Sequence, residues 1–210
     1  MSVITDYPSL FNMSKIMDFF ESSKMEQYNL EHCNVDHCKV DHCKVDYINN
    51  LNLNTLKQCR AGVIVYTIYK SKMYFILGID TESGNITDFG GGISMKRENA
   101  LTGGLREFSE ETLGVFGNVD VEEIKNCVAV YDSKNIIIFL PFDVNIQSKY
   151  TEFLKRVKQV KNPEVKDLSI LNKRQFLSLI EGKDIDGTTM YDKIRKLLYS
   201  GKEKNLMRYL

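Results

Sequence analysis

The sequence predicts an α/β fold of the α+β kind, with a mixed sheet that carries helices on both faces. Three observations predict it. From residue 60 onward, short β-branched and aromatic runs alternate with stretches whose apolar residues recur at helical spacing. Clusters of Gly, Asn, Asp and Ser separate these runs. The 210 residues are 43% hydrophobic and 27% charged, which is ordinary for one globular domain with an appendage. We therefore predict a domain over 58–210 and an N-terminal extension over 1–57.

The first elements of the predicted domain are strands. AGVIVYTIY (61–69) is typical of a buried strand, and MYFILGID (73–80) follows it after a polar turn, so the two runs predict a hairpin. TESGN (81–85) has the composition of a turn, and ITDFGGGI (86–93) predicts a short strand that ends in three glycines.

The rest of the domain alternates between helix and strand. Asn99 is a good N-cap and Gly114 a good residue to follow a helix, so a helix is predicted at roughly 99–112. The remaining predictions are strands at 127–131, 135–144 and 165–171, and helices at 150–160, 174–180 and 190–199.

The N-terminal extension has a different pattern. Residues 9–22 predict a helix with one apolar face. Residues 31–48 follow a period of five, with an acidic residue, His, Cys and Val recurring in each copy, and this segment contains all three histidines of the chain. The extension is therefore predicted to be partly helical and partly of low complexity.

His and Cys are the usual ligands of zinc, but the period of the repeat does not gather them. Five residues turn an α-helix by about 500°, so successive copies point ~140° apart, and on a strand an odd period places successive copies on opposite faces. We therefore favour a solvated linker over a metal site and do not expect zinc there. An oxidised or interacting segment is the remaining alternative.

Charge and cysteine content bound the partners and the compartment. Residues 1–147 contain 13 basic and 20 acidic residues, a net charge of −7, and residues 148–210 carry the opposite net charge of +7. RNA is thus a candidate partner, although a solvated helical surface is the favoured explanation of the basic segment. No apolar run is long enough for a bilayer and no signal peptide is evident, so no membrane partner is expected. Five cysteines without an export signal indicate free thiols and a cytoplasmic location.

The stretch LREFSEETLG (105–114) places three glutamates within five positions. On a helical wheel Glu107, Glu110 and Glu111 share one face, while Leu101, Leu105, Phe108 and Thr112 form a separate apolar stripe. Like charges three and four positions apart repel each other, so this face favours cations, and carboxylate oxygens are the ligands that Mg²⁺ prefers.

Gly103 and Gly104 fall on the same face of this helix. Each costs on the order of 1 kcal/mol relative to alanine in a helix interior, which makes sense if another backbone passes close by. We expect that backbone to be the loop Gly90–Gly92, whose N–H groups can also face phosphate oxygens.

These residues resemble the signature of the Nudix hydrolases, which act on a nucleoside diphosphate linked to another group. The family pattern is Gly, five residues, Glu, seven residues, Arg-Glu, an apolar residue, any residue, Glu-Glu, any residue, Gly and an apolar residue. Gly92, Glu98, Arg106-Glu107 and Glu110-Glu111 match it in register. The chain then departs by one residue, because Thr112-Leu113 stands where the family has a single position before Gly114.

The resemblance implies a Nudix-like α/β/α sandwich and a metal-dependent pyrophosphohydrolase. It implies Mg²⁺ or Mn²⁺ as cofactor, Glu107, Glu110 and Glu111 as metal ligands, and an ion pair between Arg106 and Glu98. Gly91 and Gly92 would face the phosphates of the substrate. Glu110 and Glu111 are candidates for the general base, and Glu164, which precedes a predicted strand, is a further one.

The substrate stays open between nucleotides, dinucleotides and the 5′ cap of RNA. Decapping is the first alternative: the basic C-terminal third favours it, whereas the sequence FGGGI lacks the Pro-Lys-Gly of several decapping enzymes. A Nudix-fold module that binds nucleotide without turnover is the second alternative, because the late Gly114 could alter the end of the helix. A homodimer is expected because many members of the family are dimers.

Overall fold

The computed structural model describes residues 42–52, 57–94, 97–143 and 145–210. Its strands are β1 (Lys44–Tyr47), β2 (Arg60–Tyr69), β3 (Lys72–Asp80), β4 (Ile86–Thr87), β5 (Phe89–Gly92), β6 (Val128–Tyr131), β7 (Asn135–Pro141) and β8 (Val165–Asn172). Its α-helices are α2 (Ala100–Glu111), α3 (Ile146–Val157), α4 (Lys173–Ile180) and α5 (Asp192–Glu203). Two short 3-10 helices are η1 (Ile48–Asn50) and η3 (Leu206–Arg208). None of the helices in these ranges is long and apolar enough to cross a bilayer.

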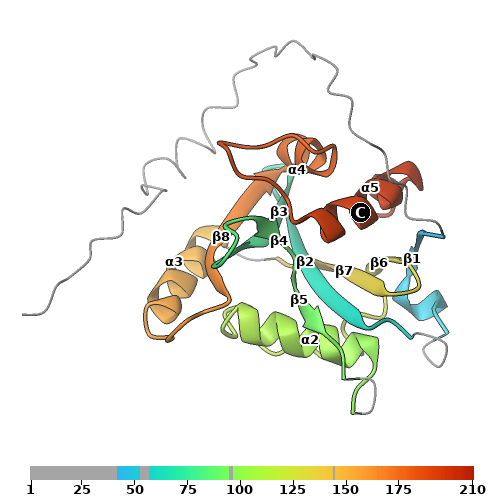
Figure 1. Cartoon of the computed structure of the whole chain (residues 1–210), viewed down its shortest axis with the longest axis horizontal. Coiled ribbons are helices and arrows are strands. Elements are labelled where there is room, and N and C mark those ends of the chain that lie inside the picture. Colours follow the sequence, from blue (N-terminus) through green and yellow to red (C-terminus); the bar gives the residue numbers. More distant parts are fainter. Residues whose placement is uncertain (1–41, 53–56, 95–96, 144) are drawn as a thin grey trace, which may run out of the picture. The chain divides into compact units, whose positions relative to one another are not determined.

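The strands of the described residues form one mixed sheet, whose main order is β1-β6-β7-β2-β3-β4 (Figure 1). The strand β2 is central: it pairs with β7 in parallel and is antiparallel to both β5 and β3. The first half of β2 pairs with β5, in the register Arg60↔Gly92, and the second half pairs with β3. The glycine-rich strand β5 is therefore hydrogen-bonded to the middle of the sheet.

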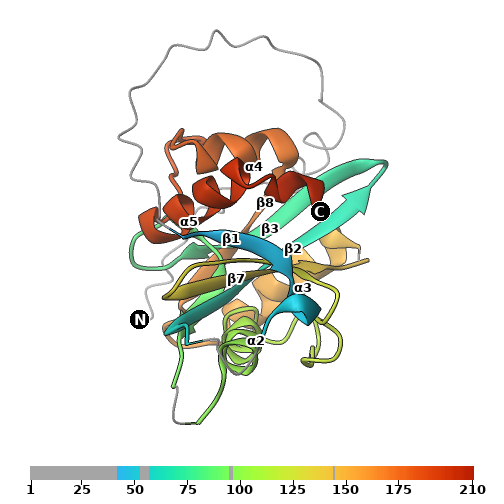
Figure 2. The same cartoon turned by 90° about the vertical axis from the view of Figure 1, so that its right-hand side faces the viewer.

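Helices cover both faces of the sheet, as the sequence predicted. Figure 2 shows α4 and α5 on one side of the strands and α2 on the other. On the α4/α5 side, Phe75 stacks on Phe176 with ring centroids 4.0 Å apart, within a cluster that includes Ile64 and Leu197. On the α2 side, Phe108 packs edge-on against Phe89 at 5.8 Å. The predicted fold class, a mixed sheet between helices, is confirmed.

Several predicted boundaries differ from the structure. The predicted strand 86–93 is two strands: β4 pairs with β3, β5 pairs with β2, and Asp88 lies between them. The helix predicted at 150–160 begins earlier, at Ile146, where Asn145 caps it. The hairpin of β2 and β3 turns at Lys70 and Ser71, which both adopt positive φ angles of 47° and 60°. This turn conformation matches the twist of paired strands.

The end of the predicted linker belongs to the sheet. Residues Lys44–Tyr47 form β1, which pairs antiparallel with β6, and Cys43 is buried against the carbonyl of Leu197. The interpretation of 31–48 as a solvated linker is therefore wrong for its last residues. The helix predicted at 9–22 and the repeat up to residue 41 lie outside the described residues.

Candidate functional site

The helix α2 carries the glutamates, and local sequence explains its bounds. The Asn99 side chain accepts hydrogen bonds from the backbone N–H groups of Leu101 and Thr102, and Thr102 in turn accepts from the Asn99 N–H, which completes a capping box. The predicted apolar stripe is buried against the sheet, at Leu101, Leu105, Phe108 and Thr112. Because this stripe packs against the sheet, the glutamates lie on another side of the helix. There Glu107 lies next to Gly91 of β5 and Glu111 next to Gly90.

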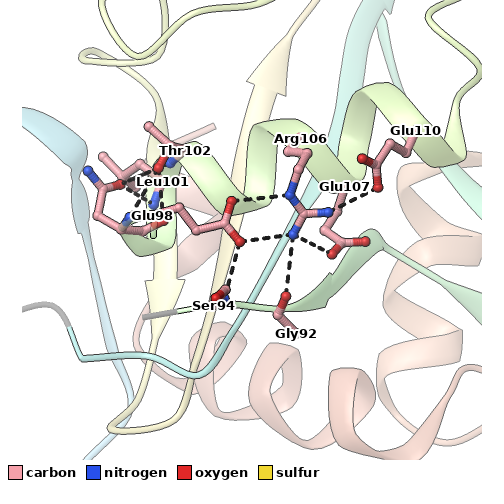
Figure 3. A network of polar contacts seen from close by, with 9 residues as sticks. Gly92, Ser94, Glu98, Leu101, Thr102, Arg106, Glu107 and Glu110 are labelled. Carbon is pink, nitrogen blue, oxygen red and sulfur yellow. Dashed lines mark hydrogen bonds and ion pairs between the residues drawn. The ribbon is translucent and has the colours of Figure 1, made fainter. Parts of the chain in front are cut away.

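Arg106 contacts three carboxylates at once (Figure 3). The predicted ion pair with Glu98 is present and bidentate, with Nε–Oε2 at 3.1 Å and Nη2–Oε1 at 3.0 Å. The same guanidinium lies 2.8 Å from Glu107 Oε1 and 3.0 Å from Glu110 Oε2. We call these four residues the Arg106 cluster. The largest cause of the raised pKa of Arg106 is its hydrogen bond to Glu98, and the same bond lowers the pKa of Glu98.

The glycines of β5 and α2 allow the helix and the sheet to approach closely. A Cβ atom on Gly91 would lie 2.6 Å from the Glu107 carboxyl carbon, so only glycine leaves Glu107 its position. A Cβ on Gly104 would lie 3.0 Å from Ala61 Cβ. One on Gly103 would lie 2.4 Å from the end of the Ile93 side chain. The predicted close approach of another backbone is found at Gly104, where that backbone is β2 and not the loop Gly90–Gly92. The nearest atoms at Gly103 belong to the side chains of Ile93 and Glu98.

Glu111 lies in different surroundings from the Arg106 cluster. Its Oε2 accepts a hydrogen bond from the backbone N–H of Gly90 at 2.8 Å. Burial is the main cause that raises its pKa to about 9, and the charge of Asp88 is the next. The bond from Gly90 opposes the rise, while the charges of Glu164 and Glu107 add to it. Without a cation, this carboxyl group therefore binds a proton at neutral pH.

Asp88 was not among the predicted site residues. Its side chain has no exposed surface and forms a bidentate ion pair with Arg60, at 2.6 and 2.9 Å. Arg60 is the first residue of β2, and its guanidinium also donates to the carbonyl of Gly90 at 3.0 Å. A lone Asp in the run ITDFGGG gives no periodic signal, so only the pairing of β2 with β5 reveals its contact with the site.

Glu164 lies at the start of β8 with an exposed side chain, and its backbone carbonyl accepts a hydrogen bond from Thr81. Its charge acts on Glu111, so the structure brings it within electrostatic range of the predicted site. Gly92 contributes its carbonyl oxygen, which lies 3.5 Å from Arg106 Nη2. A Cβ on Gly92 would meet no atom within 4 Å.

The additional residue before Gly114 changes how the chain leaves α2. Leu113 and Gly114 both have positive φ angles, 55° and 66°, and the Gly114 N–H donates to the carbonyl of Ser109. Arg156 of α3 donates to the carbonyl of Leu113 at 2.6 Å, and Lys149 donates to that of Val115 at 2.7 Å. Two cations from α3 thus cap the C-terminal end of α2, beyond all three predicted ligands.

The oxygen ligands suit a hard divalent cation. Three carboxylates on one helix face are the donors that Mg²⁺ and Mn²⁺ take, and the charges of Asp88, Glu164 and Glu107 add to the burial that raises the pKa of Glu111. Among the residues that the structure describes, however, no three acidic, His or Cys side chains are gathered closely enough to hold a metal. Arg106 holds Glu107 and Glu110 instead, so a metal would have to compete with this guanidinium.

Cys43, in the last copy of the His/Cys repeat, is part of the hydrophobic core. Burial raises the pKa of the Cys43 thiol to about 11, so this sulfur is a neutral core group. Cys43, Cys59 and Cys127 are all free thiols, as predicted for these described cysteines.

Comparison with known proteins yields distant structural likenesses. Neither a protein-family model nor a curated protein matches the chain. One matching solved structure is an Ap4A hydrolase of C. elegans in a binary complex, with 14% identity over 70% of this chain and 96% of that chain, and a TM-score of 0.41. Another is the Nudix domain of NrtR from Shewanella oneidensis complexed with ADP ribose, with 12% identity, coverage of 74% and 94%, and a TM-score of 0.41. Such low values assign neither family nor activity, which must be inferred from the side chains of the chain itself.

Proposed function

We propose that the chain is a metal-dependent pyrophosphohydrolase of the Nudix type, which cleaves the diphosphate linkage of a nucleoside diphosphate derivative. The observation that carries the proposal is the surroundings of Glu111. Its carboxyl group is buried within range of the charges of Asp88 and Glu164, next to a glycine backbone and at the end of a helix face with two further glutamates. Excess negative charge at such a place favours a bound cation together with the phosphates that the cation attracts.

Glu107, Glu110 and Glu111 would hold Mg²⁺ or Mn²⁺. When bound, the cation supplies charge neutralisation for the phosphates and lowers the pKa of a bound water. The β5 backbone at Gly91 and Gly92 faces the phosphate chain. A water oxygen attacks phosphorus, the bond to the bridging oxygen breaks, and the proton goes to a carboxylate. Glu111 is the first candidate for this base, Glu110 and Glu164 the others. Glu98 orients Arg106, which pairs with Glu107 and Glu110 in the absence of the cation.

The test is a release assay with Mg²⁺ or Mn²⁺ on a panel that contains nucleoside triphosphates, nucleotide sugars, diadenosine tetraphosphate, ADP-ribose and capped RNA. Replacing Glu111 by Gln is expected to reduce kcat by about 10²–10⁴-fold. Glu122→Gln is the matched control, because Glu122 is exposed and pairs with Lys125 in a distant turn. Equal release by wild type and Glu111→Gln from every compound would overturn the proposal.

Capped RNA in the panel also tests the decapping alternative. Release that rises with RNA length and falls with salt would indicate that the basic C-terminal third contacts the RNA backbone. Release from the free cap dinucleotide at the same rate would remove RNA as the preferred substrate.

A nucleotide-binding module without turnover is a second candidate, and the hold of Arg106 on Glu107 and Glu110 favours it. If the guanidinium is never displaced, the metal ligands remain incomplete. Calorimetry that shows nucleotide bound in Mg²⁺ but no product after long incubation would favour this second function. Turnover of any panel compound would exclude it.

A further inference from the structure

The ion pair between Arg60 and Asp88 is buried next to the proposed site. The side chain of Asp88 is 0% exposed and that of Arg60 is 16% exposed. The two residues are 28 positions apart and come from β2 and from the gap between β4 and β5. Buried ion pairs often contribute little net stability because both charges are removed from water. Arg60 also contacts the backbone of β5, at Gly90.

The strand β2 leaves space for the Asp88 carboxylate at Gly62. A Cβ atom at Gly62 would lie 2.1 Å from Asp88 Oδ2. Even alanine there would push the carboxylate away from Arg60. The bidentate geometry thus depends on the absence of a side chain at Gly62 in the central strand. Gly62 is also the residue that pairs with Gly90 of β5.

Gly90 joins the ion pair to Glu111. Its carbonyl accepts from Arg60 Nη2 at 3.0 Å, and its N–H donates to Glu111 Oε2 at 2.8 Å. A Cβ on Gly90 would lie 2.3 Å from the Gly62 Cα and 2.5 Å from the Ala61 carbonyl oxygen. The residue is therefore pressed against β2, and Arg60 and Glu111 hold its carbonyl and its N–H.

We infer that Arg60 and Asp88 are positioning residues for Glu111: the ion pair holds the Gly90 backbone so that its N–H is directed at the Glu111 carboxylate. The inference deepens the proposed function and rests on it for its kinetic readouts. Asp88 orients Arg60 through two hydrogen bonds, Arg60 fixes the Gly90 carbonyl, and Gly90 in turn fixes one oxygen of Glu111. The other Glu111 oxygen is left for a cation or a water.

The first experiment measures kcat and KM for Arg60→Lys and Asp88→Asn with the most active compound of the panel. Lysine keeps the charge but loses the forked geometry, and asparagine keeps the shape but loses the charge. We expect kcat to fall about 10–100-fold in each variant, with KM within about threefold of wild type, because misplacement affects the transition state most. Lys202→Gln is the control: it removes an ion pair with Glu181, between α5 and the end of α4, that is more exposed than Arg60–Asp88 and does not involve β5.

A double-mutant cycle distinguishes positioning from general support of the fold. If Arg60 acts through Glu111, adding Arg60→Lys to Glu111→Gln should reduce the residual kcat by less than about twofold. A loss as large as in the wild-type background would mean that Arg60 acts independently of Glu111, and this would overturn the inference.

A readout without turnover keeps this inference separate from the proposed function. In protein labelled with ¹⁵N-glycine, the Gly90 amide signal should shift in Glu111→Gln and shift in the same direction in Arg60→Lys and Asp88→Asn. Lys202→Gln should leave it in place. A Gly90 signal that stays at its wild-type position in folded Arg60→Lys and Asp88→Asn overturns the inference, whether or not the protein hydrolyses any nucleotide. If one variant does not fold, the other decides the result.

Discussion

The carboxylates of α2 and of Glu98, just before it, lie in two contrasting surroundings. In the Arg106 cluster, Glu98, Glu107 and Glu110 share one guanidinium, and the pKa of Glu98 is lowered. One residue further along, Glu111 is buried beside Asp88 and receives only a backbone N–H, so its pKa is raised to about 9. The nearby guanidinium of Arg60 is hydrogen-bonded to Asp88 and not to Glu111. Arg106 therefore neutralises one part of the helix face from within the protein, whereas Glu111 requires a proton or an added cation.

Apart from the replacement of Glu111, the largest expected effect comes from crowding the Arg106 cluster at Gly91. In Gly91→Ala the new Cβ would lie 2.6 Å from the Glu107 carboxyl group, so Glu107 must move away from its position beside β5. We expect kcat/KM to fall by about 10²-fold, in line with a displacement of about 1 Å at a catalytic site. Gly92→Ala adds a Cβ with no neighbour within 4 Å and should keep the wild-type Tm. A fully active Gly91→Ala would show that the position of Glu107 is not critical.

The second prediction concerns how the stability of the folded chain depends on pH through Glu111. Its folded pKa of about 9 exceeds the ordinary value of 4.5, so between these values the folded chain binds a proton that the unfolded chain has released. Its contribution to stability is therefore full below pH 4.5 and is lost as the pH rises to about 9. The slope is at most about 1.4 kcal/mol per pH unit.

Thermal unfolding in EDTA, compared between wild type and Glu111→Gln, measures this slope. The variant should lack it, and Mg²⁺ should raise the Tm of wild type more at pH 8 than at pH 5.5. Parallel pH curves for the two proteins would contradict the assigned surroundings of Glu111.

The third prediction removes a carboxylate from the neutralised region. In Glu98→Gln the bidentate partner of Arg106 is lost, and Tm at pH 7 should fall by a few degrees, about 2–4 °C for each kcal/mol in a chain of this size. Because the pKa of Glu98 is lowered in the fold, its contribution is present above the ordinary value of 4.5 and disappears as the pH falls through its folded pKa. The difference in Tm from wild type should therefore shrink in acid; a constant difference would argue against the ion pair as its cause.

The smallest effect on stability and activity is expected at the C-terminal exit of α2, beyond the three glutamates. Arg156→Gln removes the hydrogen bond to the Leu113 carbonyl, which should cost about 1 kcal/mol of unfolding free energy because the group is partly exposed. The kcat should stay within about twofold of wild type, since the contact lies C-terminal to Glu107, Glu110 and Glu111. Chemical denaturation and the release assay measure the two quantities. A large loss of activity would show that the exit of α2 shapes the site.

The predictions from sequence succeeded where the causes were local. The N-cap at Asn99 and the apolar stripe follow from spacing within about 15 residues of one segment, and the ion pair of Glu98 with Arg106 was implied by the resemblance to the Nudix signature in that segment. A helix fixes the relative positions of such residues by its own geometry, so no tertiary information was needed to place the three glutamates on one face.

The features that the sequence did not predict depend on pairing between distant segments. Arg60 meets Asp88 and Gly90 only because β2 and β5 pair in one register, and a shift by one residue would turn Arg60 to the opposite face. The same cause explains β1: four residues of a repeat carry a weak strand signal, and their pairing with β6 gives them their structure. Neighbours of the helical glycines were misassigned for this reason too.

The strand β1 is formed mostly by the last unit of the repeat, which has a consequence for the number of units before it. The sequence DHCKVD occurs at 36–41 and again at 41–46, and the second copy supplies Cys43 and most of β1. Loss of residues 36–40 would still leave DHCKVD directly before Tyr47, and gain of a unit upstream would also leave it there. A change in the number of upstream units would thus leave the edge of the sheet with the same residues.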